Sequence, residues 1–239
     1  MAQIGTWITI PHLPIIKYIN NLFDFVILDM EHGHLDIETI QNILTMQDFS
    51  KIFVRIPEYN QVLINQLQDA DCRNILVSHI ENSVMAQKVY DCSKYKSTEY
   101  KNGFRGLSPF TPGNHFGVNM IIENHNCNVG ILVEGQGTLL FNFKQICQTD
   151  IKFIYIGIYD LAMSMGYDGD KNHPAVQARL EECIYWAKKN NKKIATFARN
   201  VEDAKQLKSM GVDYIAIGND SNILAEQYTK LYKDFVIDK

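Results

Sequence analysis

The chain has 239 residues, of which 46% are hydrophobic and 21% are charged. This length and balance are typical of one globular domain with a substantial core, and they exclude a disordered or collagen-like chain. The 23 lysines and arginines against 27 aspartates and glutamates give a formal net charge of −4, with no long block of one sign. We therefore expect no nucleic acid partner.

The distribution of apolar residues and cysteines indicates the cellular environment. No apolar run approaches the roughly 20 residues that a membrane-spanning helix needs, and residues 1–10 lack the features of a signal peptide. We expect a cytoplasmic protein without a membrane partner. The five cysteines are odd in number and widely spaced, which favours reduced, packed thiols over disulfides or a zinc site.

Short β-branched or aromatic runs recur along the whole chain, and most are followed by polar turn residues and a segment with helical periodicity. This is the pattern of βα units and a parallel sheet. No linker or repeat divides the chain, so we expect a single domain over residues 1–239. The eight predicted strands are Ile4–Ile8, Phe25–Met30, Ile52–Ile56, Ile75–Ile80, Val129–Val133, Phe153–Ile158, Lys193–Phe197 and Tyr214–Ile217.

Three of the helices between these strands have clear signals. A helical stripe of apolar residues follows Asp36, and another begins at Pro174, a residue favoured in the first helical turn. Asn200 is a suitable N-cap for a third helix, which Gly211 ends. Eight strands alternating with helices predict a (β/α)8 TIM barrel, although a doubly wound open sheet has the same alternation.

Charged residues follow several of the predicted strands. Glu31 and His32 follow the second, Arg55 lies in the third, Glu134 ends the fifth and Asp160 follows the sixth. The carboxyl ends of barrel strands share one rim, so these side chains are expected to lie together. Two carboxylates from neighbouring strands supply hard oxygen ligands, so Glu134 and Asp160 predict a site for Mg²⁺ or Mn²⁺.

The remaining residues at this rim have both structural and catalytic interpretations. His32 is either a structural histidine or a proton relay, and Arg55 either an ion-pair partner or a cation that stabilises an enolate oxygen. Asp69, in the helix after the third strand, has the simplest interpretation of surface charge. Lys51, Lys152 and Lys193 begin strands on the far side of a barrel, so carbonyl activation by a metal ion is preferred over a Schiff base.

An ordered series of motifs resembles the HpcH/HpaI aldolase family, the metal-dependent (class II) pyruvate aldolases. The series covers essentially the whole chain. Its members are Gly5-Thr6-Trp7, Asp29-Met30-Glu31-His32-Gly33, Val54-Arg55-Ile56-Pro57, Gly103-Phe104-Arg105-Gly106, Val133-Glu134, Tyr155-Ile156-Gly157 with Asp160-Leu161-Ala162, His173-Pro174-Ala175-Val176 and Ile217-Gly218-Asn219-Asp220.

The resemblance implies a (β/α)8 barrel of the pyruvate/phosphoenolpyruvate-binding superfamily, with a C-terminal helix exchanged between subunits and dimers that build a hexamer. It also implies a role for each matching residue. Glu134 and Asp160 would bind the divalent metal (Mg²⁺, Mn²⁺ or Co²⁺), Arg55 the keto or enolate oxygen of pyruvate, and the backbone of Gly157, Ile158, Tyr159 and Asp160 its carboxylate, while His32 with Asp69 would relay protons and Glu31 would orient water at the metal.

The sequence departs from the family pattern mainly at residues that shape the pocket. Leu132 replaces the usual glutamine, Ile158 and Tyr159 replace a proline and a small residue, and Ser78 replaces a proline. The expected reaction is reversible cleavage of a 4-hydroxy-2-oxo acid to pyruvate and an aldehyde. Two alternatives remain open: decarboxylation or thioester chemistry at the same site, and a non-catalytic metabolite-binding barrel.

Overall fold

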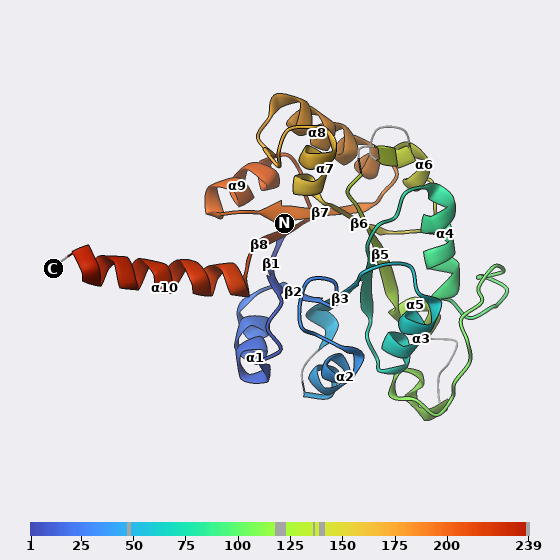
Figure 1. The fold of residues 1–239 in the computed structure, drawn as a ribbon. Coiled ribbons are helices and arrows are strands. Elements are labelled where there is room, and N and C mark those ends of the chain that lie inside the picture. The colour runs from blue at the N-terminus through green and yellow to red at the C-terminus, as the bar shows by residue number, and fades with distance from the viewer. Residues whose placement is uncertain (47–48, 118–122, 136, 139–141, 238–239) are drawn as a thin grey trace.

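The strands close into one barrel of eight parallel strands in sequence order, and β8 pairs with β1 (Figure 1). The computed structural model describes residues 1–239 except 47–48, 118–122, 136, 139–141 and 238–239. The predicted TIM barrel is therefore confirmed. The strands are β1 (Gln3–Ile8), β2 (Phe25–Asp29), β3 (Ile52–Ile56), β4 (Asn74–Val77), β5 (Asn128–Val133), β6 (Phe153–Ile156), β7 (Lys193–Ala198) and β8 (Tyr214–Asn219).

Helices surround the barrel and connect its strands (Figure 1). The three predicted helices are present as α2, α8 and α9, with Pro174 in the first turn of α8 and Asn200 capping α9 through a hydrogen bond from Asp203 N. The helices are α1 (Leu13–Leu22), α2 (Ile37–Met46), α3 (Gln61–Asp69), α4 (Ser83–Cys92), α5 (Glu123–Asn126), α6 (Phe143–Ile146), α7 (Ile158–Ser164), α8 (Pro174–Lys189), α9 (Val201–Ser209) and α10 (Asp220–Ile237), with 3-10 turns at Phe49–Lys51 and Pro112–Gly117.

Three strands end earlier than the sequence predicted: β2 ends one residue early, at Asp29, and β4 and β6 end two or more residues early at the functional rim. β4 stops at Val77 rather than Ile80, because the chain turns sharply at His79, whose φ of 56° lies in the left-handed region. β6 stops at Ile156 rather than Ile158, because Ile158 begins α7. In both cases a buried isoleucine, Ile80 or Ile158, lies just past the strand, so hydrophobicity alone did not mark the end.

Alternate residues of each strand face inward, and the inward residues fill the barrel with side chains. In β6, Phe153 and Tyr155 belong to this inner cluster, whereas Ile154 and Ile156 pack outward against the helices. The full inner cluster is Trp7, Phe25, Ile27, Phe53, Leu76, Leu132, Phe153, Tyr155, Ala195 and Ala216.

The amino-terminal half of this inner cluster is aromatic. The rings of Phe25, Phe53 and Phe153 pack together with that of Tyr214, which lies against the cluster, and the contacting centroids are 4.9 to 6.1 Å apart. Gly130 makes room for this packing, since a Cβ there would lie 2.7 Å from the ring of Phe153. The barrel is therefore closed by rings at its amino-terminal end, and the cluster of Arg55 with Asp29 lies at the other end.

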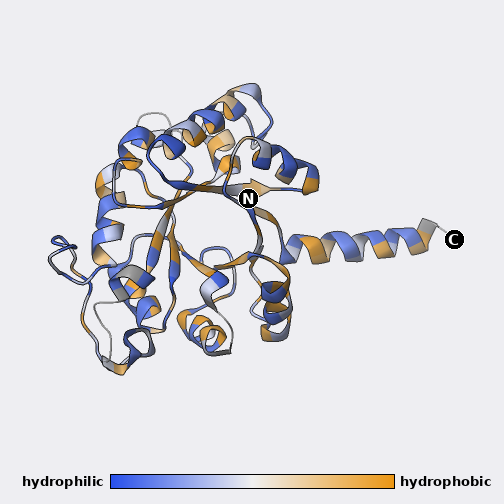
Figure 2. Ribbon diagram, turned by 180° about the vertical axis from the view of Figure 1, so that it is seen from behind, coloured by the Kyte–Doolittle hydropathy of each residue, from blue (hydrophilic) through white to orange (hydrophobic). Residues whose placement is uncertain are grey.

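The last helix, α10, extends away from the barrel rather than packing along it (Figures 1 and 2). Its first residue, Asp220, fastens it to the end of β1, because the Asp220 carboxylate accepts hydrogen bonds from Thr9 N, Thr9 Oγ1 and Ile10 N. Large apolar side chains along α10 are exposed: Ile223, Leu224, Tyr228, Leu231, Tyr232, Phe235 and Val236.

All five cysteines are buried free thiols, as expected from their number and spacing. Burial raises the pKa of each of Cys92 and Cys147 to about 12, so these thiols are protonated at neutral pH. Within the described part of the chain, no helix combines the length and the apolarity that crossing a membrane requires.

Candidate functional site

Of the charged residues predicted at the strand ends, His32, Arg55, Glu134 and Asp160 line a cavity of about 210 Å³ at the carboxyl end of the barrel. Arg55 comes from β3, Glu134 follows β5, and Asp160 lies in the first turn of α7. Asp29, at the end of β2, faces Arg55 in the strand register. The closed sheet therefore brings together residues that are more than 100 positions apart in the sequence.

Arg55 is held rigidly by two carboxylates and one aromatic ring. Its Nε and Nη2 donate to the two oxygens of Asp29 over 2.8 and 2.5 Å, and its Nη1 lies 3.2 Å from Glu31 Oε2. The guanidinium carbon lies 4.5 Å from the centre of the Trp7 ring. Burial lowers the pKa of Arg55, but the hydrogen bond and the charge of Asp29 together raise it by more than burial lowers it, so the net shift is upward. Arg55 is a fixed cation.

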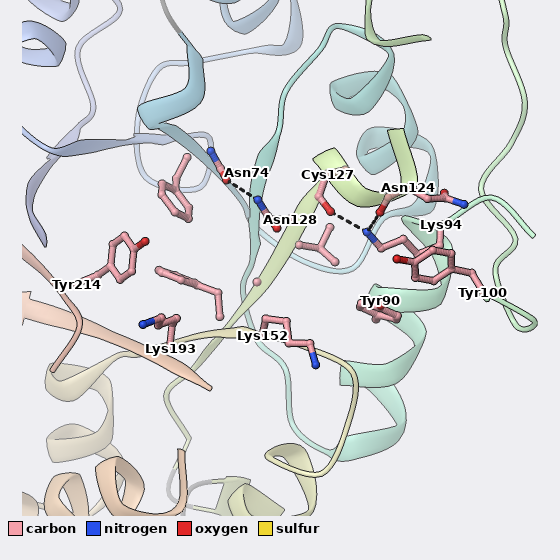
Figure 3. Close-up of a pocket in the computed structure, with 14 residues that line it drawn as sticks. Asn74, Tyr90, Lys94, Tyr100, Asn124, Cys127, Asn128, Lys152, Lys193 and Tyr214 are labelled. Carbon is pink, nitrogen blue, oxygen red and sulfur yellow. Dashed lines mark hydrogen bonds between the residues drawn. The ribbon is translucent and has the colours of Figure 1, made fainter. Parts of the chain in front are cut away.

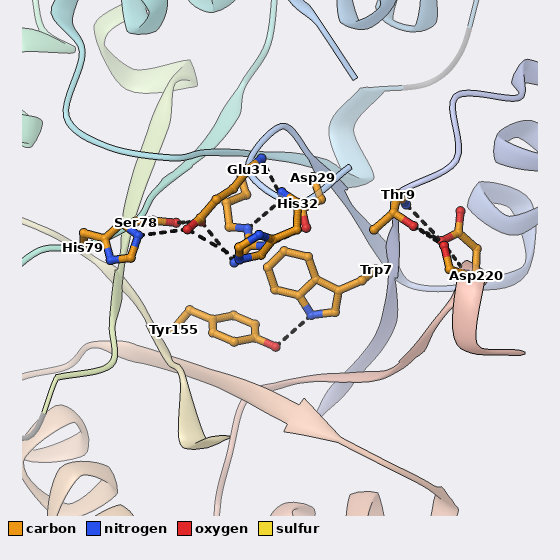
Figure 4. Close-up of polar contacts among 11 residues, drawn as sticks. Trp7, Thr9, Asp29, Glu31, His32, Ser78, His79, Tyr155 and Asp220 are labelled. Carbon is orange, nitrogen blue, oxygen red and sulfur yellow. Dashed lines mark hydrogen bonds and ion pairs between the residues drawn. The ribbon is translucent and has the colours of Figure 1, made fainter. Parts of the chain in front are cut away.

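Two residues after β4 connect the carboxylates of the site (Figure 4). Ser78 Oγ donates to Glu31 Oε2 over 2.7 Å. The two ring nitrogens of His79 lie 2.9 Å from Glu31 Oε1 and 2.9 Å from Glu134 Oε1. Because His79 adopts a left-handed backbone conformation, its ring lies between these acids, a strained arrangement of the kind found at functional sites.

Glu134 and Asp160 form a like-charge pair. Burial, followed by the charge of Asp160, raises the pKa of Glu134 to about 7. Both carboxylates surround Gly157: a Cβ on that glycine would lie 3.2 Å from Glu134 Oε2 and 3.5 Å from Asp160 Oδ2. Glu134 Oε1 is buried and accepts no hydrogen bond of good geometry, despite its proximity to His79.

This pair fits a divalent cation. A cation between the two carboxylates would neutralise their repulsion and use the Glu134 oxygen that accepts no hydrogen bond, and carboxylate oxygens are the ligands that Mg²⁺ and Mn²⁺ prefer. Among the described residues, no group of three His, Cys, Asp or Glu side chains is arranged to hold a metal ion. A cation held by Glu134 and Asp160 alone would leave most of its coordination positions to water and substrate.

The structure does not bring His32 and Asp69 together. His32 is largely exposed, with its Nε2 3.6 Å from Glu31 Oε1, and its backbone N–H donates to Asp29 Oδ1. Asp69 instead accepts hydrogen bonds from Arg105 Nη2 over 3.1 Å and from Asn114 Nδ2 over 3.3 Å. In the single chain, therefore, the implied pairing of His32 with Asp69 is absent, and Asp69 neutralises a buried arginine.

The segment expected to bind a carboxylate is only partly available. The Gly157 N–H donates to Val133 O over 2.9 Å, so it is used in the barrel and is not free for a ligand. The side chain of Ile158 is buried in the core, and Tyr159 lines the cavity while its ring packs edge-on against Phe197. The amides of Ile158, Tyr159 and Asp160 begin α7 and lack the partner that a residue four positions earlier would supply.

Sequence reasoning assigned no role to several residues of the site, namely Trp7, Asp29, Ser78, His79 and Tyr155. Asp29 could have been found, since it ends the strand beside Arg55 and opposite charges on neighbouring strands pair. His79 had no periodic signal, because it lies in a turn that the pattern assigned to a strand.

A second cavity, of about 340 Å³, lies at the opposite end of the barrel (Figure 3). Its buried Lys94 is engaged, since Nζ donates to Cys127 O over 2.8 Å and also to Asn124 O. Asn74 donates to Ser50 O and Ile52 O. The side chains of Lys152 and Lys193 extend in different directions (Figure 3). These polar groups hold the chain together rather than converging on a ligand.

Comparison with known proteins agrees with the geometry. The model of the HpcH/HpaI aldolase/citrate lyase family matches residues 8–226. The chain belongs to this family. It is 29% identical to a 5-keto-4-deoxy-D-glucarate aldolase of Klebsiella pneumoniae over 98% of this chain and 92% of that protein, and 30% identical to one from an Enterobacter species with the same coverage.

Solved structures of other proteins share the fold. An HpcH/HpaI aldolase/citrate lyase family protein from Burkholderia cenocepacia has a TM-score of 0.91 at 21% identity, covering 98% of this chain and 94% of that one. The citrate synthase SbnG has a TM-score of 0.86 at 20% identity, covering 99% and 94%. The family and the named relatives together make this chain an aldolase, a carbon–carbon lyase, as the sequence predicted.

Proposed function

We propose that this aldolase cleaves a 4-hydroxy-2-oxo acid to pyruvate and an aldehyde, with a divalent cation held by Glu134 and Asp160. The observation that carries the proposal is the pair of neighbouring carboxylates lining the cavity, in which Glu134 has a raised pKa and one oxygen without a hydrogen bond. Mg²⁺, Mn²⁺ and Co²⁺ all suit this donor set. When bound, the cation would supply a Lewis acid that polarises the 2-oxo group.

Arg55 supports the same step from the opposite side of the cavity. Cleavage between C3 and C4 leaves negative charge on the oxygen at C2, and a fixed cation stabilises charge that develops there. Asp29 and Glu31 engage three of the guanidinium N–H groups, which leaves two for a ligand. Because Trp7 and Asp29 fix its orientation, little reorganisation is needed as the charge forms.

His32 is the proposed proton acceptor for the C4 hydroxyl, directly or through a water molecule. It lies at the exposed rim beside Glu31, on the side from which an aldehyde would leave. Glu31 is the proposed orienting group for water near the cation, and it is itself positioned by Ser78 and His79. The amides of Ile158, Tyr159 and Asp160 are the proposed donors to the substrate carboxylate.

The relatives suggest the first substrate to test. They are named for 5-keto-4-deoxy-D-glucarate, a dicarboxylate, so we propose that this chain also accepts an acid with a polar group beyond C4. Tyr159 and Phe197 border this side of the cavity and would limit the size of the aldehyde.

We also propose that the chain works as a homo-oligomer, a dimer or a hexamer, in which α10 is exchanged between subunits. The support is the row of exposed apolar side chains on a helix that leaves its own barrel. An exposed apolar stripe of this kind is typical of a protein–protein interface.

The deciding experiment measures pyruvate release from a panel of 4-hydroxy-2-oxo acids by the purified protein. We expect release with Mn²⁺ or Mg²⁺, loss after chelation, and recovery when the ion is returned. Glu134→Gln should lower turnover by about 1,000-fold or more and weaken Mn²⁺ binding, because it removes a charged ligand. Glu81→Gln, which changes an exposed acid outside the cavity, is the matched control.

Three outcomes would contradict the proposal. Activity that survives chelation would exclude the cation, and carbon dioxide as the co-product would assign a decarboxylase. Neither product from any acid would favour a binding protein.

A further inference from the structure

The inner face of β6 places a phenol in the floor of the active cavity. Tyr155 lines that cavity together with Arg55 and Leu132, and only 2% of the residue is exposed. The Trp7 indole Nε1–H donates to Tyr155 Oη over 2.9 Å, and the two rings meet edge-on with centroids 5.3 Å apart (Figure 4).

The direction of this hydrogen bond determines where the tyrosine proton can go. An indole nitrogen only donates, so Tyr155 Oη is the acceptor and its own proton is left over. Among the described residues, no oxygen or nitrogen accepts this proton. Burial raises the pKa of Tyr155 well above its usual range, which keeps the phenol neutral and protonated.

The surroundings of the hydroxyl point to a ligand as the missing acceptor. Leu132, its partner in the strand register, offers no polar atom. Arg55, which stacks on the same Trp7 ring, also has donors to spare and none that accept. A phenol and a guanidinium, both donors and both fixed, therefore face the same cavity. An acceptor there would satisfy both groups at once.

We propose that the Tyr155 hydroxyl donates a hydrogen bond to an oxygen of the bound 2-oxo acid beside Arg55, and so selects planar ligands that carry adjacent oxygens. This inference rests on the proposed function for the identity of the ligand. Tyr155 transfers no proton in this role: it binds and orients the substrate. A hydrogen bond to a charged acceptor contributes more than one between neutral groups.

Oxalate is the probe, because it is planar, carries adjacent oxygens and cannot be cleaved as an aldol. Calorimetric titration in the presence of Mn²⁺ compares the wild type with Tyr155→Phe, which keeps the ring and removes only the hydroxyl. We expect the oxalate Kd to rise by roughly tenfold or more. Tyr214→Phe, which removes a tyrosine hydroxyl at the far end of the same inner cluster, should leave Kd unchanged.

A second pair of variants separates binding from folding. Tyr155→Phe leaves the Trp7 N–H without its partner and can lower stability for that reason alone. Comparing Trp7→Phe with the double variant Trp7→Phe/Tyr155→Phe removes the hydroxyl in a background where no indole needs it. The roughly tenfold rise in Kd should recur there.

The results divide cleanly. A Tyr155→Phe protein that melts earlier but binds oxalate as tightly as the wild type would show a purely structural hydroxyl and overturn the inference. Wild-type protein that fails to bind oxalate would overturn it too. If the Kd change is found but no 4-hydroxy-2-oxo acid is cleaved, the proposed reaction fails while the donor role of Tyr155 stands.

Discussion

Acidic residues at the rim of the barrel perform different tasks because they have different neighbours. Both oxygens of Asp29 accept hydrogen bonds from Arg55, whereas one oxygen of Glu134 accepts none. Asp69 lies beside Arg105, whose side chain is only 1% exposed, and so compensates a buried charge. Residue type alone therefore does not assign a role. A carboxylate whose oxygens already accept hydrogen bonds from the protein is not available to a metal ion, whereas one with an oxygen that accepts none is.

Asp69→Ala should destabilise the protein more than it impairs chemistry. The substitution leaves the buried Arg105 guanidinium without a carboxylate, and breaking such a pair typically costs about 3–5 kcal/mol. Urea denaturation followed by circular dichroism would measure the loss. Asp71→Asn is the matched control, since Asp71 pairs with the more exposed Arg73 and should cost about 1 kcal/mol or less.

The opposite pattern would give Asp69 a different role. Unchanged stability together with a large fall in turnover would support the acid–base partnership with His32 that the family resemblance implies, with Asp69 contributed across a subunit contact.

At the residue scale, the sequence predicted which charges gather but not how they pair. Arg55, Glu134 and Asp160 were found because parallel strands present their carboxyl ends at one rim. The contacts of His79 depend on a left-handed turn, and no hydrophobic period reports such a turn. The role of Tyr155 depends on the direction of one hydrogen bond, which only the packed interior defines.

At the scale of elements, periodicity predicted every strand of the barrel, and the disagreements lie at strand ends. An apolar run marks burial, and burial continues past β4 into Ile80 and past β6 into Ile158. Cap signals were more precise where they existed. Asn200 begins α9, and Gly211, with a φ of 93°, follows its last turn, because their chemistry acts on specific backbone groups.

Asp213 links three elements and should make their docking depend on pH. It precedes β8, accepts from Ile194 N in β7 over 3.0 Å and pairs with Lys188 of α8 over 2.7 Å. Burial raises the pKa of Asp213, but the bonds from Lys188 and Ile194 lower it more, so the net shift is downward. The stabilisation is therefore present above the unfolded pKa of about 3.9 and is lost as pH falls through the lower folded value.

Asp213→Asn is expected to lose about 0.5–1 kcal/mol of stability at pH 7, a modest figure because the group is partly solvated. The difference from the wild type should shrink as the pH falls below about 4. Urea midpoints measured from pH 7 down to pH 2.5 would test this. A difference that stays constant over that range would mean that the carboxylate charge does not tie these elements together.

At the scale of the molecule, the count of strands and the family resemblance predicted the closed barrel. The assembly could not be predicted from hydrophobic periodicity, because an amphipathic helix has the same periodicity whether it covers its own barrel or that of another subunit. The structure adds one observation, that α10 leaves the barrel with its apolar side chains exposed, and this supports the proposed exchange.

Placing charges on α10 should prevent association. The double variant Leu231→Glu/Phe235→Glu replaces two apolar side chains with carboxylates. Both positions are 65% exposed in the single chain, so the melting temperature of the barrel should not change. Light scattering after size-exclusion chromatography is expected to show monomers for this variant and a dimer or hexamer for the wild type. Lys233→Ala on the same helix is the control. A wild type that is already monomeric would remove the proposed exchange of α10.

The aromatic packing of Phe25, Phe53, Phe153 and Tyr214 closes the amino-terminal end of the barrel, so the active cavity is a cup that opens at the carboxyl end. Whatever enters the cup must leave by the same mouth. In the proposed reaction the aldehyde fragment lies nearer that mouth, with the pyruvate fragment beneath it against Arg55 and Tyr155. The products then leave in a fixed order. The aldehyde leaves first, and pyruvate blocks the cavity to the next substrate until it also leaves.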